Sequence, residues 1–436
     1  MNLNIFLYEV RHFTRSKAKL YSYLFFMFIC LISIFNGFQI SNKQTQTILE
    51  INNKKQIEYE KVLGWFDNNN KGPVDQSWIN VEDPYWAIRS TPSYVVKDPS
   101  SLMPLGIGQS QQFGFYKKVN RWSSTYDDDI VEEISNYERL INGNIDFSFL
   151  VIFLLPVLLI IMTYNINGLE KDLGFHKLIS IQNNRVKLWV FTRLLFYLFL
   201  VLFSVNILIL SIGLFNSGFS EVQSVLSLIL ISNLYIILFF VVFYFLNKNG
   251  KSSTSIAFKM ISVWLLFCII IPGSVHQYVS YKYPVNYMTD FLDVNRKQTY
   301  DIFKLDNSDI YTKLLEIHPE ISLNKDFLEI NLESKKIRRS ICSIINKMNV
   351  DAANEIERQN EDKNRLIRFT YTFNPVSYVQ NFWNSCTSTD YDSYKKFRLK
   401  IKESVRSRNE LLVLEIWKEN KVDKAKYKEY LEVLNN

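Results

Sequence analysis

Long runs without a charged residue alternate with charged segments along the chain. Five such runs of 21 to 27 residues are rich in Leu, Ile and Phe: residues 20–40, 147–169, 194–220, 222–247 and 260–281. A helix needs about 20 apolar residues to cross the roughly 30 Å hydrocarbon core of a bilayer, where every backbone polar group must be paired. The pattern therefore predicts a helical membrane protein with five transmembrane helices, at residues 20–40, 147–168, 194–215, 222–247 and 255–276.

Basic residues beside these spans predict their orientation. Three segments carry them. Before the first span these residues are Arg11, Arg15, Lys17 and Lys19; between the second and third spans they are Lys171, Lys177, Arg185, Lys187 and Arg193; and between the fourth and fifth spans they are Lys248, Lys251 and Lys259. The short connection near residues 216–221 has no Lys or Arg. Because Lys- and Arg-rich loops stay in the cytoplasm, we expect residues 1–19 and 169–193 to be cytoplasmic. The C-terminus and the polar regions 41–146 and 277–436 are then extracytoplasmic.

The two polar regions have different patterns. Region 41–146 holds half of the ten prolines, which predicts a mixed subdomain with irregular or β structure between helices at 42–66 and 126–141. Region 277–436 contains two apolar stripes at helical spacing: Ile337, Ile341, Ile344 and Met348, then Tyr391, Tyr394, Phe397, Ile401 and Val405. These stripes predict two long helices whose apolar faces pack on each other.

Composition excludes several functions. The mean hydropathy of −0.03 is an average over the uncharged apolar runs and the highly charged segments between them. Aromatic residues make up 15% of the chain. The net charge of +7 is mild, and we expect no nucleic-acid partner. Gly250, Lys251 and Ser252 form only half of a phosphate loop, because Phe245 stands where the first glycine is required. The four histidines are scattered, so we expect no metal site and no enzymatic activity of the chain's own.

A few polar residues remain as candidates. Asn206 and Asn233 lie within predicted spans, either lining a translocation path or, as we favour, forming interhelical hydrogen bonds. Cys342 and Cys386 lie in the second polar region, where they form a disulfide or remain two free thiols.

One loop carries a family resemblance. Glu170, Gly174, Lys177, Leu178 and Arg185 match a pattern of ABC-2-type exporter permeases, in which the second span is followed by an acidic residue, a glycine and a short amphipathic helix. Phe175 replaces the small hydroxyl residue that is usual after the glycine. In the family this coupling helix docks on the ATPase. The resemblance therefore implies ATPase-coupling roles for Glu170, Gly174, Phe175, Lys177, Leu178 and Arg185.

Three other segments resemble the branch of this family that has large extracytoplasmic domains, related to bacterial gliding-motility and copper-processing permeases. Residues 7–17 resemble the amphipathic elbow helix before the first span. Residues 99–108 and 374–397 resemble segments of the branch's outer domains, with Ser388 in place of a usual glycine. Family members usually have six spans, whereas this sequence offers five.

The resemblance implies a permease subunit of an exporter in a bacterial cytoplasmic (inner) membrane. It would bind no cofactor directly, because ATP and Mg belong to a separate cytoplasmic ATPase. A second permease subunit, identical or related, and membrane lipid are the other implied partners. The alternative is a non-transporting membrane scaffold or signal transducer that binds a periplasmic or surface partner through its outer helical domain.

Overall fold

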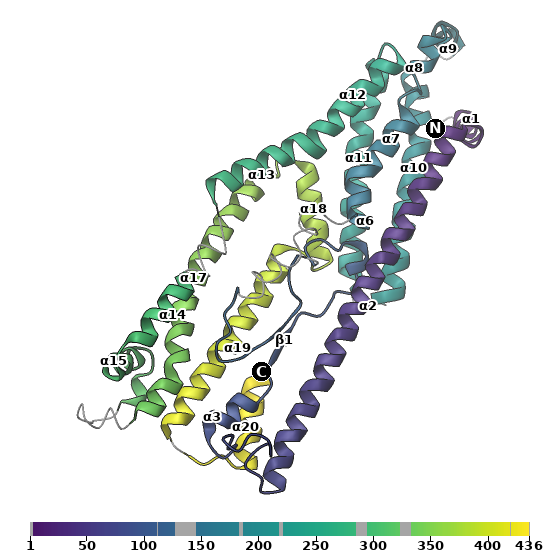
Figure 1. Cartoon of the computed structure of the whole chain (residues 1–436). Coiled ribbons are helices and arrows are strands. Elements are labelled where there is room, and N and C mark those ends of the chain that lie inside the picture. Colours follow the sequence, from purple (N-terminus) through teal and green to yellow (C-terminus); the bar gives the residue numbers. More distant parts are fainter. Residues whose placement is uncertain are drawn as a thin grey trace.

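The computed structural model describes residues 3–110, 112–126, 145–182, 186–217, 221–284, 294–322, 333–418 and 420–435. It is an elongated helical molecule with an apolar bundle at the end that holds the N-terminus (Figure 1). A second body, which we call the polar domain (the described parts of residues 41–126 and 294–435), extends from the bundle and contains the C-terminus.

Five helical segments of the described chain are long and apolar enough to cross a membrane, which confirms the predicted number. They are α2 (Lys17–Asp67), Phe147–Asp172, Val186–Asn216, α11 (Val222–Asn249) and Ser253–Lys282. The second consists of α6 (Phe147–Phe149), η2 (Leu150–Leu154), α7 (Leu155–Thr163) and α8 (Gly168–Asp172). The third consists of α10 (Val186–Ile212) and the start of η3 (Gly213–Ser217). The fifth consists of α12 (Ser253–Leu265), η4 (Leu266–Ile270) and α13 (Ile271–Lys282).

The five segments are buried to different degrees. In the most apolar window of the second segment 67% of the residues are buried inside the molecule, against 17% in the fifth. The second segment is therefore the centre of the bundle, and the fifth lies at its edge. Large apolar side chains such as Phe25, Phe203 and Phe258 remain exposed on the outside of the bundle, as expected where helices face lipid. This is the architecture of a multi-pass helical membrane protein.

Proline causes a π-helical turn in two of these segments. Pro156 follows η2 and Pro272 follows η4. Because proline has no N–H and its ring clashes with the carbonyl four residues earlier, the helix opens locally. In η2 the carbonyl of Ile152 accepts a hydrogen bond from the hydroxyl of Tyr235 at 2.5 Å. The neighbouring span α11 (Val222–Asn249) therefore supplies the hydrogen-bond donor that Pro156 lacks.

The first segment continues far beyond its apolar part. α2 has 51 residues and, at 1.5 Å per residue, a length of roughly 75 Å. The predicted helix at 42–66 is thus confirmed as part of one unbroken helix that runs from the bundle along the polar domain (Figure 1). Its partner at 126–141 falls almost wholly outside the described residues.

The proline-rich segment that follows α2 is short and mixed, as predicted. It contains α3 (Pro84–Ser90), η1 (Met103–Leu105) and a two-stranded antiparallel sheet. In the sheet, β1 (Tyr94–Val96) pairs with β2 (Tyr116–Lys118), and Tyr94 lies opposite Lys118. Asp83 caps α3 by accepting a hydrogen bond from the backbone N–H of Tyr85 at 3.0 Å, and Pro84 fits the first turn of that helix.

The remaining polar domain is helical. Its elements are α14 (Val294–Lys304), α15 (Asn307–Ile317), η6 (Pro319–Ile321), α17 (Ser334–Thr370), α18 (Pro375–Cys386), α19 (Tyr391–Lys418) and α20 (Lys424–Asn435). The two apolar stripes lie on α17 and α19. Ile337, Ile341 and Ile344 of α17 join a core with α14, α15 and the far end of α19. In contrast, Ile401 and Val405 of α19 pack on Val119 beside the sheet.

The expected packing of the two stripes on each other is therefore only partly correct. Val413 of α19 does enter the core that α17 forms, but it lies two turns beyond the predicted stripe. In the Tyr391–Val405 part of α19, Phe397, Ile401 and Val405 pack on Val119 and Tyr394 packs on Phe113. The hydroxyl of Tyr391 instead donates to Glu357 of α17 at 2.5 Å. The sequence pattern identified the faces correctly, but it could not identify the element that each face covers.

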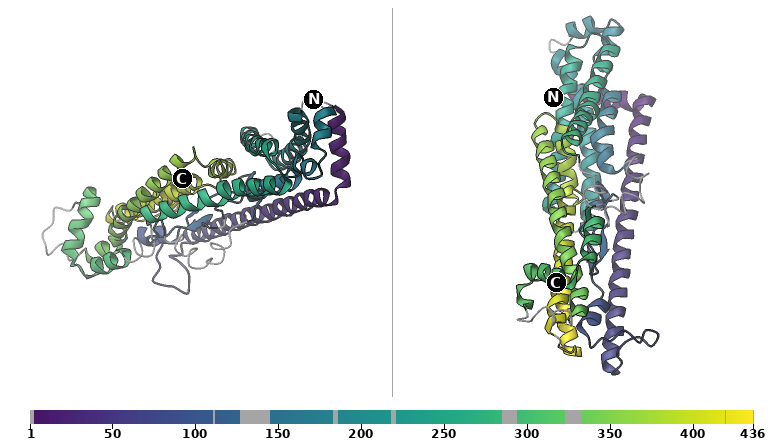
Figure 2. Two further views of the ribbon diagram at one scale, coloured as in Figure 1. Left: turned by 90° about the horizontal axis from the view of Figure 1, so that it is seen from above. Right: turned by 60° about the vertical axis from the view of Figure 1, so that its left-hand side comes forward.

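The two polar regions form one body, because each contacts the other along its length. The hydroxyl of Tyr59 on α2 donates to Oδ1 of Asn435 at 2.7 Å. Arg408 of α19 donates to the carbonyl oxygen of Ile88 on α3 at 2.6 Å. Figure 2 shows α2 running beside the helices of the C-terminal half in two views. The far end of α2 therefore has a firm attachment in a domain built from both halves of the chain.

The suggested disulfide does not form. Cys342 and Cys386 are both free thiols. Cys342 is buried near the start of α17 in a core with α3, α19 and α20, whereas Cys386 ends α18 and packs against the apolar bundle. From Cys342 to the end of α17 the helix is roughly 40 Å long at 1.5 Å per residue, which keeps the two sulfur atoms apart.

Candidate functional site: a buried charge cluster beside an exposed apolar helix

The N-terminal helix α1 (Leu3–Arg15) lies across the end of the bundle, at an angle to α2 (Figure 2). Its inner face carries Phe6 and Phe13, whose rings contact the ring of Phe196 on α10 at centroid distances of 5.5 and 5.7 Å. Leu7 and Tyr8 on its outer face are exposed. The helix is thus amphipathic, as expected for an elbow helix, and Glu9 lies on its buried side.

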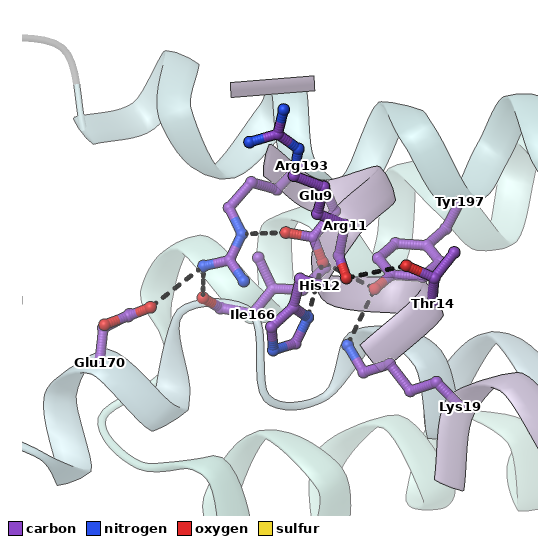
Figure 3. Close-up of polar contacts among 9 residues, drawn as sticks. All are labelled: Glu9, Arg11, His12, Thr14, Lys19, Ile166, Glu170, Arg193 and Tyr197. Atoms are coloured by element: carbon purple, nitrogen blue, oxygen red, sulfur yellow. Dashed lines mark hydrogen bonds and ion pairs between the residues drawn. The ribbon is translucent and has the colours of Figure 1, made fainter. Parts of the chain in front are cut away.

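Glu9 is the centre of a buried charge cluster (Figure 3). One of its carboxylate oxygens accepts a hydrogen bond from Nε of Arg193 at 2.5 Å, and the other accepts from the hydroxyl of Tyr197 at 2.6 Å. Arg193 also donates through Nη1 to the carbonyl oxygen of Ile166 at 2.9 Å and to Glu170 at 3.3 Å. The cluster therefore connects α1, the second segment and α10.

Two further basic side chains complete the cluster. Lys19 at the start of α2 donates through Nζ to the hydroxyl of Tyr197 at 3.0 Å, and Nδ1 of His12 lies 3.5 Å from Glu9. Glu9, Lys19, Arg193 and Tyr197 are all buried. The two carboxylates of Glu9 and Glu170 balance the charges of Arg193 and Lys19. This balance is what makes buried ions tolerable, since an unpaired buried charge costs several kcal/mol.

The pKa of Glu9 shows how strongly its anionic form is held. Burial by itself raises this pKa, but the hydrogen bond from His12, the charge of Arg193 and the hydrogen bonds from Arg193 and Tyr197 outweigh it. The result is a pKa of about 2 instead of 4.5. Glu9 therefore stays charged at every physiological pH, which makes it a fixed anchor between helices and a poor proton carrier.

Sequence reasoning missed this cluster. It used Lys19 and Arg193 only to orient the spans, and Glu9 only as part of the elbow-like segment. One signal was present in the sequence: Glu9 lies three residues after Phe6 and four before Phe13, which places a carboxylate on the apolar face of α1. Its partner Arg193 is 184 residues away in sequence.

The start of the predicted coupling loop is held firmly against the bundle. Nδ2 of Asn167 donates to the carbonyl oxygen of Asn247 at 2.9 Å, and Nζ of Lys171 donates to that of Gly250 at 2.6 Å. A Cβ atom added to Gly168 would lie 2.5 Å from Cα of Ser253, so only glycine permits this approach. Helix α8 is therefore clamped to the turn between α11 and α12.

The next helix, α9 (His176–Gln182), is not clamped. It begins after Gly174, which adopts a left-handed conformation with φ of +75°. Four large apolar side chains on it and just before it are between 50% and 79% exposed, namely Leu173, Phe175, Leu178 and Ile181, whereas Ile179 is half-buried. In Figure 1, α9 lies at the extreme end of the molecule, beyond α8. The bundle thus presents a short apolar helix that is covered by no other described part of the chain.

The predicted coupling residues separate into two groups. Phe175, Lys177 and Leu178 are exposed on and beside α9, and Gly174 makes the turn before it. Glu170 instead points inward to Arg193 and belongs to the charge cluster. Arg185 lies outside the described residues.

Asn206 and Asn233 lie on two of the spans, as predicted. Within the described residues, Oδ1 of each side chain is buried and has no hydrogen-bond partner. The two residues lie on neighbouring helices, α10 and α11. The sequence does not show whether they lie at the same level along the two helices. The two interpretations, lining of a translocation path and interhelical hydrogen bonding, therefore both stay predictions.

A junction between the bundle and the polar domain is built from the two segments that resemble outer parts of the permease branch. Nε1 of Trp383 on α18 donates to the carbonyl oxygen of Leu105 at 2.9 Å. Oγ1 of Thr389 donates to that of Gly106 at 3.1 Å. Residues 99–108 and 374–390 thus meet, although about 280 positions separate them.

The same loop also contacts the ends of the spans. Asp146 caps the second segment by accepting from the N–H of Phe149 at 2.7 Å, and its other oxygen accepts from the N–H of Ile107 at 2.8 Å. The side chain of Asn216 donates to the carbonyl oxygen of Ser101. These contacts attach the ends of two spans to the loop at 99–108.

Among the described residues, no group of three or more His, Cys, Asp or Glu side chains is close enough together to hold a metal ion. No protein-family model, curated protein or solved structure matches the chain significantly.

Proposed function

We propose that the chain is the transmembrane permease subunit of a bacterial ABC-2-type exporter. In this proposal a separate cytoplasmic ATPase binds ATP and Mg, and the permease couples hydrolysis to substrate export or to conformational work in the polar domain. A second permease subunit, identical or related, completes the complex. The N-terminus and α9 are cytoplasmic, and the polar domain is extracytoplasmic.

The exposed apolar face of α9 is the observation that carries this proposal. Leu178 and Ile181 on α9, together with Leu173 and Phe175 just before it, are in contact with water. Such exposure is unfavourable by about 25 cal/mol for each Å² of apolar surface. Such a face therefore marks a surface that another molecule covers. Its position at the tip of the bundle, after a left-handed glycine and beside a clamped α8, suits docking into a groove of a partner protein.

The contacts behind α9 provide a route for coupling. Lys171 ties α8 to the turn before α12, and Glu170 ties it to Arg193 and through this to Glu9 on α1. A displacement of α9 by the ATPase would shift the populations of two arrangements of these packed helices. At the other end of the bundle, the 99–108 loop and the continuous α2 would carry the change into the polar domain.

The test is a pull-down of the tagged chain from mild detergent, made in cells of its source organism. The variant Leu173→Ser, Phe175→Ser, Leu178→Ser removes the apolar face of α9. The matched control Ile57→Ser, Val74→Ser, Trp78→Ser changes three exposed apolar residues of the polar domain. Mass spectrometry and ATPase assays identify the partners in each eluate.

We expect an ATP-binding subunit with the wild type and the control, and at least tenfold less of it with the α9 variant. Recovery of the same amount with the α9 variant would contradict docking at α9. If the partners of the wild type include no ATPase and consist only of proteins that bind the polar domain, the scaffold or signal-transducer function replaces the exporter.

A further inference from the structure

A pocket of about 340 Å³ lies in the polar domain, away from the apolar bundle. It is formed between α3, the segment after β2 and α19. Its volume falls in the range of small-molecule sites, which begins at roughly 300 Å³. Ile88 and Leu412 form an apolar part of its wall, and Tyr85 and Trp122 form an aromatic part.

Three arginines line this pocket: Arg89, Arg121 and Arg408. In the described part of the chain, none of the three forms an ion pair with a carboxylate. The acceptor that Arg89 and Arg121 share is the hydroxyl of Tyr85, which lies 3.4 Å from Nη1 of Arg89. The guanidinium of Arg121 also stacks against Trp122, 4.9 Å from the ring centroid.

Arg408 is the most constrained of the three, with 3% of its surface exposed. Its Nη2 donates to the carbonyl oxygens of Ile88 and Thr91 at 2.6 and 2.8 Å. Its Nη1 is buried and has no hydrogen-bond partner among the described residues. Burial lowers the pKa of this guanidinium to about 10, so it is still a cation at neutral pH.

The groups around the arginines do not neutralise them. The nearby carboxylate of Asp83 is already paired with Arg339 at 2.7 Å. Burial raises the pKa of the Cys342 thiol to about 11, with Arg121 and Arg408 pulling it down less strongly, so this thiol is neutral. A buried cation that lacks both a counterion and one hydrogen-bond acceptor is unfavourable, and an anion in the pocket would supply both.

We propose that this pocket binds a small organic anion. A carboxylate or phosphate group of the ligand accepts hydrogen bonds from Nη1 of Arg408 and from Arg121, since guanidinium groups match the geometry of both anions. The apolar or aromatic body of the ligand lies between Trp122 and the apolar wall of Ile88 and Leu412. The site does not include α9, so this proposal does not depend on the exporter function.

Isothermal titration calorimetry on the full chain in lipid nanodiscs tests the site. The probes are phenyl phosphate, benzoate, inorganic phosphate and the neutral benzyl alcohol. We expect one molecule of phenyl phosphate or benzoate to bind per chain, with weaker binding of inorganic phosphate and no heat from benzyl alcohol. Comparing phenyl phosphate with benzoate identifies the anionic group that the site prefers.

We expect the variants Arg121→Gln and Arg89→Gln to keep the fold, because Arg89 is exposed and Arg121 is half-buried, whereas Arg408 also supports the backbone of α3. Loss of a charged hydrogen bond should weaken binding of the preferred probe about tenfold or more with Arg121→Gln. The matched control Arg406→Gln removes an exposed arginine from the same helix and should leave affinity unchanged. Failure of every anion to bind, equal binding of benzyl alcohol, or full affinity in both rim variants would overturn the proposal.

Discussion

Replacing Glu9 with glutamine should destabilise the protein by about 3 kcal/mol at neutral pH. Each unit of pKa shift corresponds to about 1.4 kcal/mol, and the pKa of Glu9 is lowered from 4.5 to about 2. The free energy from this shift is therefore about 3 kcal/mol. It agrees with the roughly 3–5 kcal/mol that breaking a buried ion pair costs when a charge is left uncompensated, because Arg193 and Lys19 would then share the single carboxylate of Glu170.

The pH dependence of this effect has a definite sign. Because the pKa of Glu9 is lower in the folded state, its stabilisation is fully present above pH 4.5 and is lost as the pH falls toward 2. The difference in unfolding free energy between wild type and Glu9→Gln should therefore be largest at pH 7 and less than half as large at pH 3.

The assay is SDS titration of the protein in mixed micelles, followed by tryptophan fluorescence. The double variant Glu9→Gln, Arg193→Met removes one charge of each sign and should be more stable than the Glu9→Gln variant, since the charges of Glu170 and Lys19 again balance. Glu50→Gln, which changes an exposed carboxylate of α2, is the control and should stay within about 0.5 kcal/mol of wild type. The reasoning is refuted if Glu9→Gln matches this control, or if the double variant loses as much as the two single changes combined.

Three other changes test the packing. Gly37→Ala places a Cβ atom 2.6 Å from the carbonyl oxygen of Pro104 and should cost about 1–3 kcal/mol in the same titration; Gly64→Ala, on the same helix with open space around it, should be neutral or stabilising. Tyr235→Phe leaves the carbonyl of Ile152 without its donor and should cost about 1–3 kcal/mol; an unchanged midpoint would show that this carbonyl has another partner. Cys342 is buried, and burial raises the pKa of its thiol to about 11, so N-ethylmaleimide should label it only after unfolding, as measured by peptide mass spectrometry. Rapid labelling of the native protein would contradict the described core.

The elements that the sequence predicted well are those with a local cause. A charge-free run of more than 20 apolar residues has essentially one stable form in a membrane, so all five spans were predictable. The spacing of Ile337, Ile341 and Ile344 likewise defines a helix face whatever covers it. In the same way, the prolines of the 73–104 segment exclude a long helix there.

The pairings between distant elements could not be predicted. Glu9 meets Arg193, and Trp383 meets Leu105, only because of how the spans and the polar domain pack. The sequence also does not show the relative height of two helices. It therefore left open whether Cys342 and Cys386 pair, and it predicted the packing of the two stripes only in part. The arginine pocket could not be predicted from the sequence either, because Arg121 precedes the second span and Arg408 follows the fifth.

The central claim is that α9 docks on a separate ATP-binding subunit. Site-specific photo-cross-linking in native membranes tests it most directly, with Leu178→p-benzoylphenylalanine on α9 and Phe203→p-benzoylphenylalanine on the exposed face of α10 as the control. The account predicts a cross-link from position 178 to an ATP-binding protein and none to that protein from position 203. Cross-links from position 178 only to lipid, or to proteins without an ATP-binding site, would contradict it.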